Sequence, residues 1–413
     1  MKILGIVAEY NPFHNGHLYH IEKSKEITGA DAVIAVMSGN FVQRGEPAIV
    51  DKYARAEMAV RNGADVVFEL PFCYAVNSAD NFAKGSIRLL DSLGCVDYLS
   101  FGSESGNIEE LDRIAEFLAI ETREFREFLK DGLDKGESYP KARFNALLRI
   151  NKENPNLLKG SNNILGIEYL RYLKMCGSGI KPVTIKREGQ GYNESVYCAD
   201  DYKFASATAI REMIHGNVEN SILDEVIPPS VCDVLDSINC NVKLKLNDIF
   251  DNLRYRILSS TKEELAEIFA VTEGIENRLV NAARFANDVD SLIEESISKR
   301  YTGTRLRRML VQTLVGLKRK DFNFIDEEKA MYGRILGFSE KGAGIIKNIK
   351  NSDGCRIPII TNINKEILES DAQNMLLRYD LKATDIYNLI AGRSIYAYSD
   401  NVRRPYMEGH SSK

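Results

Sequence analysis

The sequence lacks the cysteine pattern of a secreted or zinc-binding protein. Its seven cysteines are scattered, odd in number and never spaced as Cys-x-x-Cys. A disulfide framework or a structural zinc site normally needs paired cysteines at regular spacing. We therefore expect a chain that works in a reducing cytoplasm, without a disulfide framework and without a metal site of its own.

Long apolar runs and a strong excess of positive charge are also absent. No segment approaches the ~20 apolar residues that span a bilayer, and the short apolar run near the N-terminus is too short for a signal peptide. We expect no contact with a membrane. The formal net charge of −5 argues against a generally basic coat, so any RNA contact has to come from a local basic surface.

What the sequence does contain is a regular alternation of apolar and amphipathic segments in its first hundred residues. The patterns predict strands over 3–8, 31–37, 65–70 and 96–101. They predict helices over 18–27, 51–62 and 78–93, with Asp51 and Gly63 as caps of the second. This alternation indicates an α/β fold with a doubly wound parallel sheet.

Ligands of such sheets bind at the carboxyl ends of the strands, near the point where the strand order reverses. Several polar or small residues fall just after predicted strands: His14, His17, Ser38, Gly39 and Gly102. We expect these residues to meet at one edge of the sheet.

The length of 413 residues favours two domains. Pro228 and Pro229 mark the predicted boundary. We expect a catalytic domain over 1–227, a mostly helical domain over 228–395 with one lone short strand at 356–361, and a loose polar tail over 396–413.

The stretch with the clearest chemical signal joins the first strand to the first helix, and it reads Glu9-Tyr-Asn-Pro-Phe-His-Asn-Gly-His17. Free N–H groups and the positive end of the helix dipole make a helix N-terminus a site for anions. The glycine allows a phosphate to approach the backbone closely. A single histidine here would be read as an ordinary turn residue, but two imidazoles and a glycine together indicate a phosphate site.

This stretch resembles the His-x-Gly-His signature of the nucleotidylyltransferase superfamily, whose Rossmann-like domains bind ATP. Together with Met37-Ser-Gly-Asn-Phe-Val-Gln-Arg-Gly-Glu-Pro47, it is similar to the tRNA(Met) cytidine acetate ligase family. The resemblance is dense over the first 105 residues and sparser to about residue 392. It implies His14 and His17 as catalytic residues.

A second signature resembles the superfamily's Ile-Ser-Ser-Thr-x-Ile-Arg motif for the phosphates of ATP. Here it reads Ala205-Ser-Ala-Thr-Ala-Ile-Arg211, so that Ala207 replaces a hydroxyl. By itself a Ser-x-Thr at a helix start is usually only a cap. In combination with the first signature, Ser206, Thr208 and Arg211 are predicted phosphate ligands, since Thr208 and Arg211 lie about one helical turn apart.

The family resemblance also implies the remaining ATP-binding positions. Those outside the two signatures are Gly102, Asn162 and Arg187, and Asn163 stays an alternative to its neighbour. Those at the first strand and helix are Val7, Ala8, Glu9, Tyr10, Asn11, Pro12, Phe13, His14, Asn15, Gly16, His17, Leu18, Tyr19 and His20. Mg²⁺ is expected with ATP, held mostly by phosphates and water.

The second substrate is expected beside the loop that follows the second strand. This loop carries Ser38-Gly-Asn40, Gln43 and Arg44, and a small carboxylate such as acetate needs only one cation or a few N–H donors. We look for its site between this loop and His17. The next helix carries three cations, Lys52, Arg55 and Arg61. They either face the substrate or form a solvated surface, and the solvated surface is favoured for Arg61.

A local basic stretch lies in the second half of the chain and reads Lys299-Arg-Tyr-Thr-Gly-Thr-Arg-Leu-Arg-Arg308, followed by Lys318-Arg-Lys320. It either tracks RNA phosphates, with Tyr301 stacking on a base, or forms the charged face of a packed helix. The candidate tRNA contacts are Lys299, Arg300, Arg305 and Arg308. The segment Tyr332-Gly-Arg-Ile-Leu-Gly-Phe338 also resembles the family, and we expect it only to pack.

The resemblance implies an ATP-dependent ligase that joins acetate to the wobble cytidine of elongator tRNA(Met). Acetyl-adenylate would be the intermediate and N4-acetylcytidine the product. Two rival functions remain at this point. One is a small-molecule adenylyltransferase of the pantetheine-phosphate type, and the other is a non-catalytic RNA-binding protein. The large helical half speaks against the first rival, and the intact His-x-Gly-His signature speaks against the second.

Overall fold

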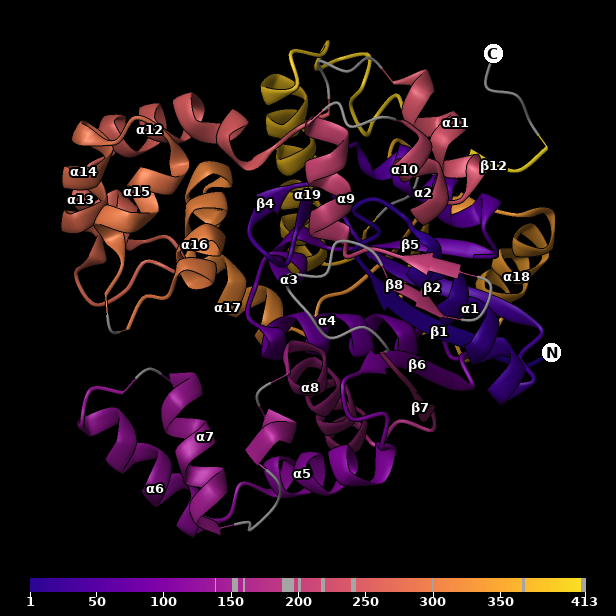
Figure 1. Ribbon diagram of the computed structural model, residues 1–413, viewed down its shortest axis with the longest axis horizontal. Coiled ribbons are helices and arrows are strands. Elements are labelled where there is room, and N and C mark those ends of the chain that lie inside the picture. The colour runs from indigo at the N-terminus through magenta and orange to yellow at the C-terminus, as the bar shows by residue number, and fades with distance from the viewer. Residues whose placement is uncertain are drawn as a thin grey trace.

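A mostly parallel β-sheet forms the centre of the computed structural model, with helices on both of its faces (Figure 1). The structure describes residues 1–137, 139–150, 155–158, 160–187, 197–199, 202–216, 220–238, 243–298, 300–365 and 368–409. The central strands are β1 (Ile3–Ala8), β2 (Ala32–Ser38), β5 (Val66–Leu70), β6 (Tyr98–Ser103) and β7 (Lys181–Lys186). The strands from the second half are β10 (Gly333–Phe338), β11 (Ile359–Ile360) and β12 (Tyr406–Met407).

The strand order places the reversal point next to β1. The order is β11-β10-β5-β2-β1-β6-β7, and β12 pairs with β10. The chain therefore runs outward from β1 through β2 to β5, and then crosses to the other side of β1 to form β6 and β7. All pairs among these five strands are parallel, as the alternating pattern predicted. The crevice between the carboxyl ends of β1 and β6 is where this fold binds ligands.

Alternate residues of the strands enter two separate cores. Ile3, Ile34 and Val36 face one core, whereas Leu4 and Ile6 face the other. This is the period of two that a strand buried on both faces requires. The β1 and β2 segments read as continuous apolar runs in the sequence for the same reason.

Most helices of the first half cover the two faces of the sheet. The helices of this half are α1 (Asn15–Thr28), α2 (Lys52–Arg61), α3 (Phe72–Ala75), α4 (Ala79–Ser92), α5 (Ile108–Ile120), α6 (Arg123–Asp134), α7 (Tyr139–Ile150), α8 (Ser161–Cys176), α9 (Ala207–His215), α10 (Asn220–Val226) and α11 (Pro229–Ser237). Two short hairpins join them, β3 (Phe41–Val42) with β4 (Glu46–Pro47) and β8 (Tyr197–Ala199) with β9 (Tyr202–Phe204). The pair α6 and α7 stands away from the sheet as a separate lobe (Figure 1).

Helices of the second half form another lobe beside the sheet (Figure 1). They are α12 (Phe250–Ser259), α13 (Lys262–Ala266), α14 (Ile275–Phe285), α15 (Val289–Ser296), α16 (Gly303–Val315) and α17 (Arg319–Glu327). Two further helices pack nearer the sheet, α18 (Glu340–Lys350) and α19 (Asp371–Ile390). A helical second half was expected, and it is observed.

The sheet does not end at the predicted boundary near Pro228. The segment 332–338, expected only to pack, forms β10 and pairs antiparallel with β5. The segment expected to be a lone strand is β11, and it pairs with β10. The expected loose tail differs in part: Tyr406 and Met407 form β12 and Asp400 is 4% exposed, whereas Tyr396 and Val402 are exposed.

A buried ion cluster anchors the tail at Asp400. Lys52 Nζ donates to both carboxylate oxygens of Glu69, at 2.8 and 2.9 Å, and to Asp400 Oδ2 at 2.8 Å. Arg334 Nη1 donates to the same Asp400 oxygen at 2.8 Å. The four side chains are at most 3% exposed. Helix α2, strands β5 and β10 and the tail are thus joined at the carboxyl end of β5.

Candidate active site

Helix α1 begins within the signature itself, three residues earlier than the sequence pattern suggested. His14 is its N-cap residue, and its Nδ1 accepts a hydrogen bond from the Gly16 N–H at 3.1 Å. His17 Nδ1 accepts in turn from the His14 N–H at 3.2 Å. The two imidazoles take the place of the side chains in a capping box, so both are fixed to the start of the helix.

The hydrogen bonds also fix the protonation of these rings. Burial, together with the positive charges of Arg187 and Arg211, lowers the pKa of His14 to about 3. Burial and the neighbouring His14 lower the pKa of His17 well below its ordinary value of 6.5. Both imidazoles are therefore neutral at pH 7. Since each Nδ1 is an acceptor, each Nε2 carries the proton and can donate to an anion.

Aromatic rings hold the histidines in place. The rings of His14 and His17 stack with their centroids 3.7 Å apart. Tyr10 meets His17 edge-on at 4.8 Å, and Phe13 lies 5.4 Å from it. Tyr10 has a positive φ of 46°, which is strained for a side chain of this size. Strained backbone of this kind is concentrated at functional sites.

The second signature lies against the first. Ser206 is the N-cap of α9, and its Oγ accepts from the Ala209 N–H at 3.1 Å. Arg211 donates to the backbone oxygen of Asn11 at 2.9 Å, and its other nitrogen lies 3.4 Å from Thr208 Oγ1. The structure thus joins the two signatures, which are 200 residues apart in the sequence.

Arg187 approaches the histidines from the other side of the crevice. Its Nη1 donates to Asn162 Oδ1 at 3.1 Å. Its stem crosses Gly102, where a β-carbon would lie 3.0 Å from Arg187 Cγ. Gly102 lies within β6, and not after it as the pattern suggested. A larger residue here would force the stem of the arginine to shift, so the glycine favours its approach to the site.

The structure separates the roles of the two neighbouring asparagines. Asn163 is 2% exposed, and its Oδ1 accepts from the N–H groups of Glu104 and Ser105 at 3.0 and 3.1 Å. Asn162 is more exposed and faces Arg187. Asn162 is therefore the residue directed toward the site, and Asn163 supports the loop after β6.

Glu104 contacts the candidate site residue Asn162 and was not singled out by the sequence analysis. Its carboxylate accepts from the Asn162 N–H at 3.1 Å and from Asn162 Nδ2 at 2.8 Å. It also accepts from the Asn163 N–H at 2.6 Å. It thus satisfies the N-terminus of α8 and orients Asn162. The only sequence signal was its position directly after β6, because a carboxylate there can accept hydrogen bonds from the N–H groups of a helix that begins far away in the sequence.

The β3–β4 hairpin closes the site beside β1. Glu9 Oε1 accepts from the Gln43 N–H at 2.8 Å, and burial raises the pKa of Glu9 although Arg44 opposes the change. Glu46 forms an ion pair with Arg211 at 2.8 Å. The hairpin therefore contacts both signatures.

Two cations of α2 neither face the substrate nor lie on a solvated surface, in contrast to the two expectations; both are buried and hold the fold together. Lys52 is fully buried in the ion cluster, and Arg55 is fully buried as well. Arg55 donates to the backbone oxygens of Glu9 at 2.6 Å and of Ser38 at 3.1 Å, so it ties together the ends of β1 and β2. Arg61 is partly exposed and pairs with Asp233 at 2.6 Å.

The remaining predicted ATP residues lie around this core of the site. Val7 and Ala8 end β1, and the ring centroid of Tyr19 lies 5.6 Å from that of Phe204. His20 is held by Ser100 Oγ at 2.9 Å, and burial lowers its pKa to about 4. The others belong to the β1–α1 turn or the first turn of α1: Asn11, Pro12, Asn15, Gly16 and Leu18.

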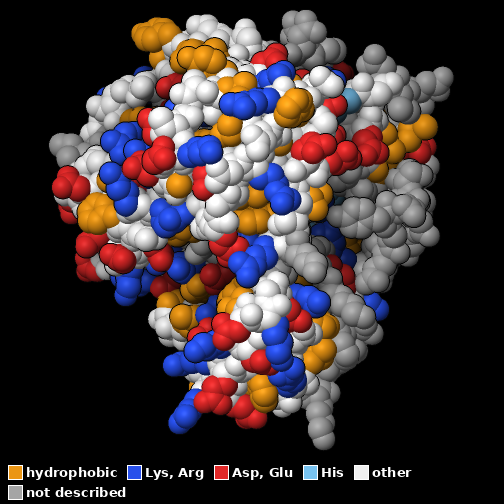
Figure 2. Space-filling model, turned by 90° about the vertical axis from the view of Figure 1, so that its left-hand side faces the viewer, with side chains coloured by type: hydrophobic (Ala, Val, Ile, Leu, Met, Phe, Trp, Pro, Cys, Tyr) orange, Lys and Arg blue, Asp and Glu red, His pale blue; other side chains and the backbone are white. Residues whose placement is uncertain are grey.

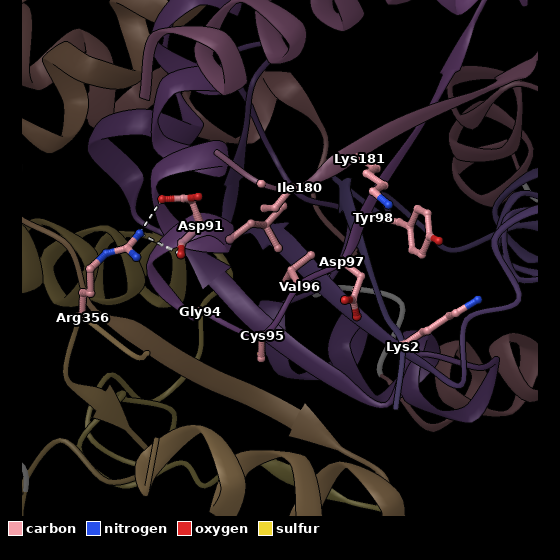
Figure 3. Close-up of a pocket in the computed structure, with 12 residues that line it drawn as sticks. Lys2, Asp91, Gly94, Cys95, Val96, Asp97, Tyr98, Ile180, Lys181 and Arg356 are labelled. Atoms are coloured by element: carbon pink, nitrogen blue, oxygen red, sulfur yellow. Dashed lines mark hydrogen bonds and ion pairs between the residues drawn. The ribbon is translucent and has the colours of Figure 1, made fainter. Parts of the chain in front are cut away.

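A cavity of about 450 Å³ lies at the opposite edge of the sheet (Figure 3). Its lining includes Lys2, Asp97 and Lys181, which are at the amino ends of β1, β6 and β7. Asp91 and Arg356, which also line it, form an ion pair that links α4 to the second half of the chain (Figure 3). Because ligands of this fold bind at the carboxyl ends, the cavity is separate from the histidine site.

The described residues contain no group of three or more His, Cys, Asp or Glu side chains placed to hold a metal ion. None of the helices among them is both long and apolar enough to cross a membrane.

The basic stretch forms the loop before α16 and the first two turns of this helix. Lys299 lies outside the described residues. Arg300 pairs with Glu273 at 3.0 Å, and the guanidinium of Arg305 lies 4.2 Å from the ring centroid of Tyr301. Tyr301 is only 3% exposed, so the expectation that it stacks on a base is wrong for this structure.

Comparison with known proteins assigns the chain to a family. The family described as HIGH Nucleotidyl Transferase matches residues 1–401. The tRNA(Met) cytidine acetate ligase of Caldicellulosiruptor saccharolyticus is 45% identical over 390 residues, 94% of each chain. That of Clostridium novyi is 41% identical over 394 residues, 94% of this chain and 96% of the relative.

Solved structures agree with the sequence comparison. TmcAL of Thermotoga maritima, solved in the apo form, has a TM-score of 0.90 at 34% identity and covers 98% of this chain and 99% of its own. A second structure of that protein, bound with α-thio ATP, gives a TM-score of 0.89 at 35% identity. Together with the two signatures at the β1–β6 crevice, these matches show that the chain belongs to the HIGH nucleotidyl transferases and, among them, to the tRNA(Met) cytidine acetate ligases.

Proposed function

We propose that the protein uses ATP to join acetate to the N4 amino group of the wobble cytidine of elongator tRNA(Met). The observation that carries the proposal is the pair of neutral imidazoles at the start of α1, flanked by two arginines. This arrangement provides N–H donors and positive charge where a triphosphate would lie. The identity of the two other substrates rests on the family.

The first half-reaction would form acetyl-adenylate. A carboxylate oxygen of acetate attacks the α-phosphorus of ATP, the bond to the β-phosphate breaks, and pyrophosphate leaves. Negative charge grows on the non-bridging oxygens, so fixed N–H donors accelerate this step. His17 Nε2 would stabilise charge on the α-phosphate, and His14, Arg187 and Arg211 would hold the triphosphate. The hydroxyls of Ser206 and Thr208 would contribute beside them.

The second half-reaction would transfer the acetyl group. The cytidine N4 attacks the acetyl carbonyl carbon and loses a proton, and the bond to AMP breaks. The products are N4-acetylcytidine and AMP. AMP leaves as a stable phosphate anion, so its departure needs no general acid, and the proton lost by N4 passes to a phosphate oxygen of AMP or to water.

Acetate, Mg²⁺ and the cellular location complete the proposal. Acetate would enter between His17 and the loop that carries Ser38 and Arg44. Mg²⁺ would bind together with ATP, held by the phosphates and by water molecules, and would neutralise part of the phosphate charge. No step described above depends on it. The cytoplasmic location stays a prediction from cysteine usage.

The tRNA would approach across the lobe of α12–α16, which carries Arg300, Arg305 and Arg308. Figure 2 looks onto this side of the molecule, where Lys and Arg side chains are spread over both lobes. We keep residues 1–227 as the nucleotide-binding part and assign RNA contact to the helices between 250 and 315. The strands β10–β12, by contrast, serve the sheet.

One experiment separates this function from its rivals. The protein is incubated with ATP, labelled acetate and a tRNA(Met) transcript. Label in the tRNA, released as N4-acetylcytidine after digestion, supports the ligase. In a parallel incubation with ATP and a phosphorylated metabolite such as 4′-phosphopantetheine, a dinucleotide-like product formed without acetate and without tRNA would support a pantetheine-type enzyme. Binding of tRNA without any turnover of ATP would support a non-catalytic RNA-binding protein.

A further inference from the structure

Arg308 differs from the other described arginines of the basic stretch. Arg300 and Arg307 each face a carboxylate, Glu273 at 3.0 Å and Asp290 at 3.6 Å. The side chain of Arg308 has no hydrogen bond or ion pair anywhere in the described ranges. Its positive charge is therefore not neutralised within this part of the protein.

The side chain is also partly removed from water. Arg308 is half-buried. Burial, and then the nearby Arg305, lower the pKa of its guanidinium to about 10. It lies in the second turn of α16, near the positive end of the helix dipole, where a cation is unfavourable. A charge that is desolvated and opposed by its neighbours costs stability unless an anion binds to it.

The position of Arg308 connects it to the nucleotide site. Gly45, at the turn of the β3–β4 hairpin, touches the backbone of α16, since a β-carbon there would lie 2.3 Å from the Arg308 nitrogen. Gly45 has a φ of 80°, so it supplies both the turn and the close approach. Two residues earlier, the Gln43 N–H donates to Glu9 at 2.8 Å. Directly after Gly45, Glu46 pairs with Arg211 at 2.8 Å.

We propose that Arg308 binds the RNA backbone phosphate next to the nucleotide that enters the active site. The inference rests on the proposed function, because it takes tRNA as the acceptor substrate. A guanidinium suits this role, as its paired N–H groups match two phosphate oxygens. The hairpin that touches α16 also contacts Glu9 and Arg211, so this contact lies beside the nucleotide site and orients the target cytidine.

The paired arginines of the same stretch contribute less. Arg305 donates to the backbone oxygen of Arg300 at 3.0 Å and to Thr272 Oγ1 at 3.3 Å. Its donors hold the loop before α16. Arg308 is a positioning residue, and the acetylation step depends on it through the RNA, not through ATP.

The test compares Arg308→Ala and Arg308→Lys with Arg307→Ala as a matched control. Arg307 precedes Arg308 on the same helix and already has a carboxylate partner. Two quantities are measured for each variant. One is acetate-dependent exchange of pyrophosphate into ATP without tRNA. The other is the affinity for a tRNA(Met) transcript at several salt concentrations.

Arg308→Ala is expected to leave the exchange rate unchanged, which also shows that the variant is folded. Its affinity for tRNA should fall about tenfold, and the slope of log affinity against log salt should decrease by about one unit. Arg308→Lys should keep the slope and lose part of the affinity, since an ammonium lacks the paired donors. Arg307→Ala should change both quantities less than Arg308→Ala.

Other outcomes refute the inference in distinguishable ways. Unchanged tRNA affinity in Arg308→Ala, with an active wild type, removes the phosphate contact and leaves the ligase function intact. Loss of pyrophosphate exchange in Arg308→Ala would instead place Arg308 at the ATP triphosphate. A wild type that acetylates no tRNA refutes the proposed function and the inference with it.

Discussion

Asparagine in place of Asp400 should destabilise the protein far more than an ordinary surface substitution. Asp400 Oδ2 accepts hydrogen bonds from Lys52, Arg334 and Thr384, each at 2.8 Å, and Oδ1 accepts from Tyr53 at 3.2 Å. Two buried cations thus face two buried carboxylates, Asp400 and the neighbouring glutamate of β5. The substitution leaves this cluster with an excess of one positive charge.

The size of the effect follows from this geometry. Breaking a buried ion pair by removing one partner costs about 3–5 kcal/mol. With ~2.1 cal/mol/K of unfolding entropy per residue and 413 residues, that loss corresponds to a fall in Tm of about 3–6 °C. Thermal unfolding followed by circular dichroism at pH 7 measures it. Asp353→Asn makes the same change of charge at an exposed residue and is the control.

The pH dependence gives a second check on the same substitution. Burial alone would raise the pKa of Asp400, but Arg334 and Lys52 outweigh it and hold the pKa well below its ordinary value of 3.8. A carboxylate whose pKa is lower in the folded than in the unfolded protein stabilises the fold at any pH above its unfolded pKa. This stabilisation is lost as the pH falls toward the folded pKa. The difference in Tm between wild type and Asp400→Asn should therefore become smaller only below about pH 4. If Asp400→Asn lowers Tm no more than Asp353→Asn does, Asp400 is not a stabilising member of the buried ion cluster.

Three further predictions concern the active site. His17→Ala should reduce acetate-dependent pyrophosphate exchange by about 10²–10³-fold, the usual cost of one lost charge-stabilising donor; an unchanged rate would contradict its role. Because the pKa of His14 is lowered to about 3, its imidazole stays neutral across the neutral range. kcat/KM for ATP should consequently show no titration of this group between about pH 6 and 8, and a loss of rate as the pH rises through 6.5 would contradict the neutral form. Glu104→Gln should raise the KM for ATP severalfold because it loosens the start of α8, whereas Glu109→Gln on the exposed start of α5 should not; equal values would remove Glu104 from the site.

The same burial links the histidines to stability. For His14, His17 and His20 the folded pKa values lie below the ordinary 6.5, so the unfolded chain binds protons more readily at mildly acidic pH. Stability should fall as the pH drops from about 6.5 toward 4. Urea midpoints measured across this range check it. A midpoint that rises on acidification would contradict neutral, buried imidazoles.

Much of the first half was predictable because its signals are local. The strand over 3–8 was predicted with the bounds that β1 has, since an apolar run between turn residues identifies a buried strand. The two signatures were predicted to bind the same ATP, and in the structure Arg211 of the second contacts Asn11 of the first. The four-residue helix α3 was missed, because Phe72–Ala75 is too short to show a helical period.

The features that sequence reasoning missed depend on distant partners. Nothing local identifies the segment 333–338 as a strand of the central sheet, since its partner β5 lies more than 260 residues earlier and a buried arginine is atypical of such strands. Lys52 was read as a surface or substrate-facing cation because its partner Asp400 is 348 residues away. Glu104 looked like one acid among many until its contacts with α8 were visible.

The antiparallel strand β10 has a consequence for synthesis on the ribosome. When the first 227 residues have emerged, β5 is an open edge of the sheet, and its glutamate and Lys52 still lack two of their partners. An uncovered strand edge invites pairing with other chains. The nascent catalytic half thus has to wait for residues 333–400 before its edge is sealed, and a ribosome that stalls between these points would release a product prone to aggregate.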